Sequence, residues 1–223
     1  MKGWCAVAAM RSAGDRLAEA AEHSVRRFGF PSSANAAGVR VFGQWAGMLY
    51  DADDAELRRR AREGLGAVTR LDLLDLLMGL PRRIPVQRGA LSARERRLLR
   101  QLPAGCVEVE SEWVTRHIVA PLTVGLAVVV VSDWRRGLDR ASRFTPFCST
   151  ILVLPRVRGD RDHMLIEAAF YGVGVAVATS SGPDMVAEPA PFVQQFHKPA
   201  AWWFAEEIHG QVQRTDVKVP NRT

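Results

Sequence analysis

Apolar residues in the second half of the chain gather in short runs, separated by segments with helical spacing. The runs are rich in β-branched residues and nearly continuous, which is typical of strands buried on both faces of a sheet. The order strand, helix, strand, helix, strand predicts an α/β fold with a short mixed or parallel sheet flanked by helices. The expected strands cover residues 107–111, 126–131, 149–155 and 173–179, and the expected helices cover residues 132–144 and 160–172.

The first half of the chain follows a helical period instead. Apolar residues recur three or four positions apart from Leu17 to Phe28, which predicts an amphipathic helix over residues 12–28. We therefore expect a mainly helical, basic region over residues 1–102 and an α/β domain over residues 103–223. Further helices are expected over residues 51–64, over residues 69–80 and from Ser92, which forms a capping box with Glu95. In the helix over residues 69–80, Thr69 is the expected cap, and the apolar face consists of Leu71, Leu74, Leu77 and Met78. Residues 39–50 fit a strand or a helix.

The tail of the chain contains one more helical pattern, over residues 192–212. Trp202, Phe204 and Ile208 supply its large apolar side chains. We expect this helix to pack against the sheet.

The formal net charge of +6 is concentrated in the first half of the chain. Residues 1–100 hold 18 Lys and Arg against 11 Asp and Glu, and the remainder holds 12 against 13. One-sided basic charge suits contacts with phosphate, although a solvated surface of an arginine-rich protein fits the same pattern. The candidate nucleic-acid-binding residues are Arg58, Arg59, Arg62, Arg135, Arg136, Arg140, Arg143, Arg156 and Arg158.

The three cysteines are odd in number and far apart, at positions 5, 106 and 148. This spacing favours a reducing compartment, which we take to be the cytoplasm, and argues against a structural zinc site. No apolar run approaches the roughly 20 residues of a membrane-spanning helix, so no membrane partner is expected.

Three segments carry a resemblance to a known family. They are Ser132-Asp133-Trp134-Arg135-Arg136-Gly137-Leu138, then Ile151 to Pro155, then Glu167 to Val175. This series resembles the second half of the PD-(D/E)xK nuclease-like (restriction-endonuclease-like) fold, found in restriction enzymes, Holliday-junction resolvases and many bacterial proteins. The resemblance implies a nuclease-type sheet and contact with nucleic acid.

The catalytic positions of that family are not kept. In the register that aligns Ser132 to Trp134, its glutamate falls on Val128 and its lysine on Val130, and neither valine can hold a divalent cation or act on a water. Its other acid is expected on the preceding strand, near residues 117–119, where the sequence has no Asp or Glu.

We therefore expect a nuclease-fold protein that binds nucleic acid without cleaving it and needs no cofactor. One alternative is a Mg²⁺-dependent nuclease whose acids have moved, with Glu108, Glu110 and Asp133 as candidates. Glu112 continues that alternation, although a solvated strand face explains these acids equally well. A second alternative is a protein-interaction module, such as a homodimer, in which the arginines only solubilise the chain.

Overall fold

A computed structural model describes residues 35–157, 159–179, 182–194 and 198–216. The chain divides into two compact units, each assembled from separate stretches of sequence. The first unit comprises Met1–Asp51 and Val124–Gln194, and the second comprises Ala52–Thr123 and Gln195–Thr223. These units do not follow the expected boundary between residues 102 and 103.

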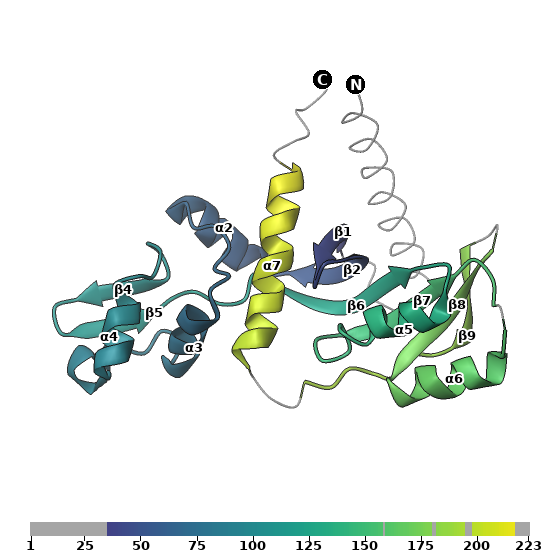
Figure 1. Cartoon of the computed structure of the whole chain (residues 1–223). Helices are drawn as coiled ribbons and strands as arrows, with labels where there is room; N and C mark the ends of the chain where they lie inside the picture. Colours follow the sequence, from purple (N-terminus) through teal and green to yellow (C-terminus); the bar gives the residue numbers. More distant parts are fainter. Residues whose placement is uncertain (1–34, 158, 180–181, 195–197, 217–223) are drawn as a thin grey trace, which may run out of the picture. The chain divides into compact units, whose positions relative to one another are not determined.

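The first unit is built on a six-stranded mixed sheet, which confirms the α/β class (Figure 1). Its three central strands are parallel, and an antiparallel strand pair closes each edge. The strand order is β1 (Asn35–Val41), β2 (Gln44–Ala52), β6 (Leu122–Val130), β7 (Ser149–Leu154), β8 (Val173–Thr179) and β9 (Gly182–Ala187).

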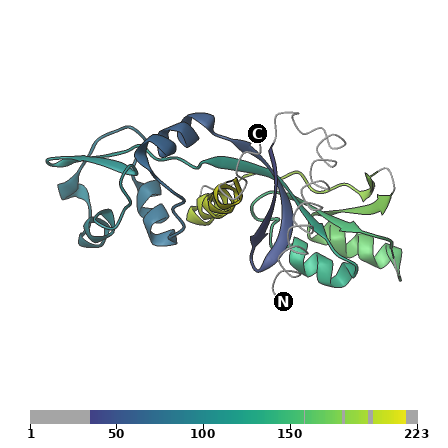
Figure 2. The same ribbon diagram turned by 90° about the horizontal axis from the view of Figure 1, so that it is seen from above.

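Two helices connect the parallel strands, as the sequence predicts. α5 (Trp134–Ala141) joins β6 to β7, and α6 (Arg161–Phe170) joins β7 to β8. The two helices contact each other and lie side by side in both views (Figures 1 and 2). The α5 cap is Asp133, whose side chain accepts the Arg135 N–H, and Ser132 does not cap this helix.

The sheet is held by apolar side chains from neighbouring strands. Leu49 of β2, Val128 of β6 and Ile151 of β7 belong to one buried cluster. Val128 is directly paired with Ile151 in the parallel register of these strands. Residues 39–50, which fit a strand or a helix, form the end of β1, a turn at Phe42 and Gly43, and most of β2, and β2 lies beside β6 in the same sheet.

The second unit combines four α-helices with a small antiparallel sheet, among the residues the structure describes. The sheet has the strand order β3-β5-β4. The elements are α2 (Asp54–Glu63), α3 (Leu71–Gly79), β3 (Val86–Gln87), the 3₁₀ helix η1 (Arg88–Ala90), α4 (Ala93–Leu99), β4 (Val107–Glu110), β5 (Trp113–Arg116) and α7 (Pro199–Asp216).

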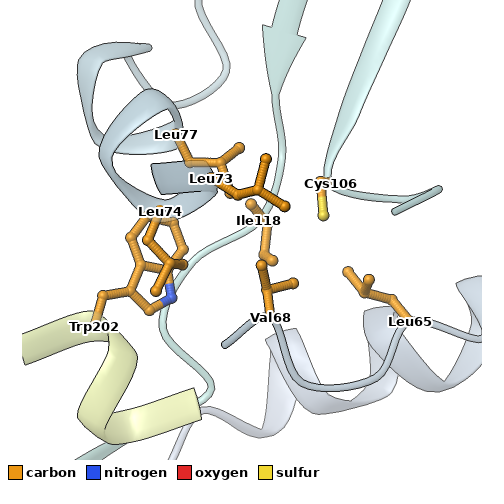
Figure 3. Packing of buried hydrophobic residues seen from close by; sticks show 8 residues of the cluster. All are labelled: Leu65, Val68, Leu73, Leu74, Leu77, Cys106, Ile118 and Trp202. Carbon is orange, nitrogen blue, oxygen red and sulfur yellow. The ribbon is translucent and has the colours of Figure 1, made fainter. Parts of the chain in front are cut away.

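Helix α7 packs against α3 in the second unit. Trp202 belongs to the same buried cluster as Leu73, Leu74 and Leu77 of α3, and Figure 3 shows these side chains together. The expected partner of this tail helix was a sheet, whereas its main apolar partner in this cluster is a helix.

Several sequence-based predictions for the first half can now be compared with the structure. The capping box of Ser92 and Glu95 is confirmed, whereas α3 begins without a side-chain cap, so Thr69 is not one. The expected apolar face of α3 is partly wrong, since Leu71 is 50% exposed and Leu73 is buried. The described part of this half mixes strands with helices, and the expected helix over residues 12–28 lies outside the described residues.

Candidate nucleic-acid interface

The junction between β6 and α5 is apolar at both positions where the nuclease-like family has reactive residues. Val128 is completely buried in the cluster with Leu49 and Ile151. Val130 follows on the same face at the end of the strand and is 43% exposed. The position aligned with the catalytic glutamate is therefore a packing position in this chain.

The strand beside β6 is β2, which corrects the expectation that the preceding strand lies near residues 117–119. β2 contains one acid, Asp51. The end of β2 lies at the start of β6, because the Asp53 N–H donates to the Pro121 carbonyl at 2.9 Å. At about 3.3 Å per residue, Val130 is roughly 26 Å farther along β6, so Asp51 and Asp133 lie toward opposite ends of the sheet.

The three candidate acids have other partners or positions. Asp133 caps α5, while the Glu108 carboxylate lies 3.1 Å from His117 Nε2. Glu110 is paired across the strands with Trp113, and Glu112 lies in the turn that follows β4. In the described ranges of the chain, no group of three or more His, Cys, Asp or Glu is placed to hold a metal ion.

The two described cysteines are buried and free. Burial raises the pKa of the Cys106 thiol to about 11 and that of Cys148 to about 12. Both side chains are therefore neutral thiols at physiological pH and are poor nucleophiles.

The arginines of α5 share their helix with acids. Arg143 forms an ion pair with Asp139 at 3.1 Å, and Arg136 lies 4.0 Å from Asp133. Both pairs are exposed to solvent, where such pairs are weak and exchange readily. Asp133 and Asp139 nevertheless offset half of the positive charge of the four candidate arginines, three of which lie on α5 and one, Arg143, just after it.

The other candidate arginines of the first unit have individual positions. The Arg135 guanidinium lies 4.4 Å from the centre of the Trp134 ring, a cation–π contact on a buried indole. Arg140 is half-buried and Arg156 is exposed after β7. Arg158 lies outside the described residues.

The candidate arginines of α2 have two different roles. Arg58 and Arg62 are exposed. Arg59 is half-buried, donates to the Glu56 carboxylate at 2.7 and 2.8 Å, and donates from Nη1 to the Gly105 carbonyl at 2.6 Å. Arg59 therefore stabilises the fold and is not available to a phosphate.

A buried ion-pair network centres on Arg60, which the sequence groups with Arg58, Arg59 and Arg62 as a candidate phosphate contact and which the structure buries instead. Arg60 is 1% exposed. Its guanidinium donates to both carboxylate oxygens of Glu206 at 2.6 and 2.8 Å, to Glu56 at 2.8 Å, and to the Val119 carbonyl at 2.8 Å. The forked pair with Glu206 connects α2 to α7 and so ties together two distant parts of the second unit.

Glu206 is fully satisfied although it is completely buried. Besides Arg60, it accepts the Trp202 indole N–H and the Val68 backbone N–H, both at 2.9 Å. The sequence carries a signal for this site, because a carboxylate four residues after Trp202 within the run WWFAEEIHG falls on the apolar face of a helix.

The pKa of Glu56 shows which effect prevails in the network. Burial alone raises the pKa of this carboxyl, but hydrogen bonds from Arg59 and Arg60 outweigh it and hold the pKa below its ordinary value. Glu56 is therefore charged at neutral pH, and the network is an ionic one.

A row of exposed arginines runs along α4, which the sequence analysis missed. Arg94, Arg97 and Arg100 are exposed at three-residue spacing, so they lie along one side of the helix. Leu98 and Leu99 contact the apolar core of the second unit from the other side. We call Arg94, Arg97 and Arg100 the α4 row.

The sequence around the α4 row is poor in acids, although α3, which contacts α4, contains Asp72 and Asp75. Residues 82–100 contain seven arginines and one acid, Glu95, whose carboxylate accepts the Ser92 N–H in the capping box. Within the described part of the chain, no residue of the α4 row forms an ion pair with a carboxylate. The excess of arginine over acid in residues 82–100 is the feature of the sequence from which the α4 row could have been predicted.

The small sheet places the acids of the second unit on a different face from α4. Val109 is paired with Val114, which lies in the core beneath α4, whereas Glu110 and its partner Trp113 point to the outer face. Glu108 shares that outer face with Glu110. The exposed arginines of α4 and the two acids of the small sheet therefore lie on different faces of this part of the second unit.

None of the described helices combines the length and apolar character that a membrane span requires. No protein-family model, curated protein or solved structure matches the chain. The fold and this surface define the molecule as a two-unit α/β protein whose second unit exposes a row of arginines on α4.

Proposed function

We propose that the protein binds nucleic acid through the α4 row, and that its nuclease-type first unit does not cleave what is bound. The observation that carries the binding proposal is the α4 row, a line of exposed arginines that form no ion pair within the described residues. Arginine binds phosphate oxygens through two parallel N–H groups, which gives this side chain an advantage over lysine at a phosphate backbone.

The dimensions of α4 suit a duplex. A seven-residue helix is about 10 Å long, and the major groove of B-form DNA is about 12 Å wide and admits a helix. The row from Arg94 to Arg100 extends about 9 Å along the axis, enough to contact phosphates beside one groove. The acids of the outer sheet face point away from this side and do not repel the duplex.

The binding test is an anisotropy titration at several salt concentrations, with duplex, single-stranded and branched oligonucleotides. Replacing the α4 row with glutamine (R94Q/R97Q/R100Q) should weaken duplex binding and lower the log–log salt slope by about 2 to 3 units, since each lost phosphate contact removes about 0.9. A matched control, R135Q/R136Q/R140Q on α5, removes the same charge and should change the slope less.

Each outcome has a distinct meaning. A larger effect from the α5 control would move the interface to the first unit. An absence of binding by the natural protein at low salt would overturn the proposal and favour a protein partner.

Adding Mg²⁺ or Mn²⁺ to the same complexes tests the second half of the proposal. Plasmid and duplex should stay intact. Cleavage that is lost in Asp133→Ala or Glu110→Ala would instead establish a metal-dependent nuclease.

A further inference from the structure

Five of the large apolar side chains that the chain exposes belong to one part of the first unit. Together they are called the apolar patch. They are Ile166 (68% exposed), Phe170 (83%), Tyr171 (47%), Phe192 (36%) and Val193 (69%).

Hydrogen bonds bring the two segments of the patch together. The Ala190 N–H donates to the Gly172 carbonyl at 3.1 Å, directly after Tyr171, and the Phe192 N–H donates to Ser149 Oγ at 3.0 Å. Ile166 and Phe170 are four residues apart on α6 and therefore share one side of the helix. The Phe170 and Tyr171 rings pack edge to face at 5.1 Å.

Helix α6 is apolar on two sides. Met164 and Ala168 are buried on one side, while Ile166 and Phe170 are exposed on another. A helix of a soluble domain usually has one apolar side facing the core, so the second apolar side of α6 is available to a partner. Exposed patches of this size mark interaction surfaces.

We propose that the apolar patch is the interface of a homodimer, with a second copy of this chain as its occupant. The five side chains expose roughly 550 Å² between them, taking 150–250 Å² for a complete aromatic side chain. Two copies related by a two-fold axis bury about twice that area, which is close to the lower limit of about 1,200 Å² for specific interfaces.

The charges of the first unit favour self-association over a charged partner. The patch contains no charged residue, and the first unit (residues 1–51 and 124–194) holds 13 Lys and Arg against 11 Asp and Glu, so its net charge is small and two copies repel each other only weakly. The nearest acid on α6 has a partner on its own helix, because a Glu167 carboxylate oxygen lies 3.0 Å from His163 Nε2.

A two-fold arrangement also fits the helix itself. Two α6 helices that run antiparallel place Phe170 of each copy beside Ile166 of the other, since an isologous interface repeats each contact twice. Each helix then covers the apolar side that the other exposes.

Sedimentation equilibrium of the full chain at several concentrations tests the dimer. The natural protein should have twice the 24.6 kDa mass of the chain, and Phe170→Glu, which brings two buried negative charges into the interface, should be a monomer. Leu71→Glu is the control, because Leu71 is 50% exposed in the second unit and outside the patch; it should leave the dimer intact.

Circular dichroism of each variant reports whether it folds. If Phe170→Glu fails to fold, Ile166→Ser together with Phe170→Ser should still lower the association constant at least tenfold. A natural protein that is monomeric at all concentrations, or folded patch variants that remain dimeric, would overturn the inference. Neither result bears on the α4 row.

Discussion

Glu206 shows how much one buried residue can decide. It supplies the counter-charge for Arg60 and accepts four hydrogen bonds, two of them from that guanidinium. Removing one partner of such a pair leaves an uncompensated charge away from water, which costs far more than the pair itself contributes.

We expect Glu206→Gln to lower the free energy of unfolding by about 3 to 5 kcal/mol. The amide keeps the shape of the side chain but removes its charge and turns an N–H₂ group toward the Arg60 donors. Urea unfolding followed by tryptophan fluorescence measures the change. The control is Glu207→Gln, next to it on α7, where the side chain accepts a hydrogen bond from Gln211 Nε2 at 3.2 Å. A loss below 1 kcal/mol in Glu206→Gln itself would contradict the structural role of the network.

His209 gives the second unit a dependence on pH. The side chain is 4% exposed, and within the described residues its Nε2 has no hydrogen-bond partner. Burial lowers the pKa of His209, and repulsion from Arg60 lowers it further, while Glu206 and Glu56 act in the opposite direction. The folded protein therefore holds the neutral imidazole.

Stability should fall as the pH drops below about 6.5, the ordinary pKa of histidine. Below that pH, His209 binds a proton in the unfolded chain but stays neutral in the folded chain. The free energy of unfolding therefore decreases, by up to about 1.4 kcal/mol per pH unit, until the pH reaches the lowered pKa of the folded state. His209→Leu should flatten this dependence in denaturation curves measured between pH 8 and pH 5. An equally steep curve for the variant would assign the effect to other groups.

At the scale of elements, the contact between α5 and the sheet depends on a glycine. A Cβ atom at Gly137 would lie 2.5 Å from Val131 Cγ2 and 2.6 Å from Leu152 Cδ1. Val131 directly follows β6 and Leu152 is completely buried on β7, so either these side chains or the helix must shift to make room.

Gly137→Ala should therefore destabilise the first unit by about 1 to 3 kcal/mol, even though alanine favours helices. Gly79→Ala is the matched control, since Gly79 ends a helix and has open space around its Cα. Thermal unfolding of both variants measures the difference, and a Gly137→Ala protein as stable as the natural one would show that α5 is free to move away from the sheet.

The elements that could be predicted from sequence are those with strong local signals. The valine run of β6, the strand from Ser149 and the capping box at Ser92 all have such signals, and all three are confirmed. The strand β2 could not be assigned, because QWAGMLYDA has neither a clear alternation nor a helical period. Its pairing with β6 depends on a residue pattern about 80 positions away.

The candidate site was harder to predict than the fold. Arginine counts singled out α5 and α2, but a count does not show which guanidinium is already bound, as with Arg59, or which is offset by an acid, as with Arg143. The α4 row was missed because residues 82–100 were judged by helix signals and not by charge balance. Burial of Arg60 follows only from the tertiary fold.

At the scale of the whole molecule, the sequence-based domain boundary assumed that each unit is continuous. The chain instead passes between the two units three times, after Asp51, after Thr123 and after Gln194. The spacing of apolar residues along the sequence shows where a helical pattern gives way to strands. It cannot show that α7 packs with helices that lie more than a hundred residues earlier in the chain.

The return of α7 to the second unit sets the timing of folding during synthesis. Arg60 leaves the ribosome 146 residues before its partner Glu206, which at about 5 to 20 residues per second is a delay of roughly 7 to 30 s. Throughout that interval α7 has not yet been synthesised, so it cannot cover the surfaces of α2 and α3 that it contacts in the folded protein. The nascent second unit is therefore a natural client for chaperones until the last helix emerges, whereas the sheet of the first unit has all its strands some time before that.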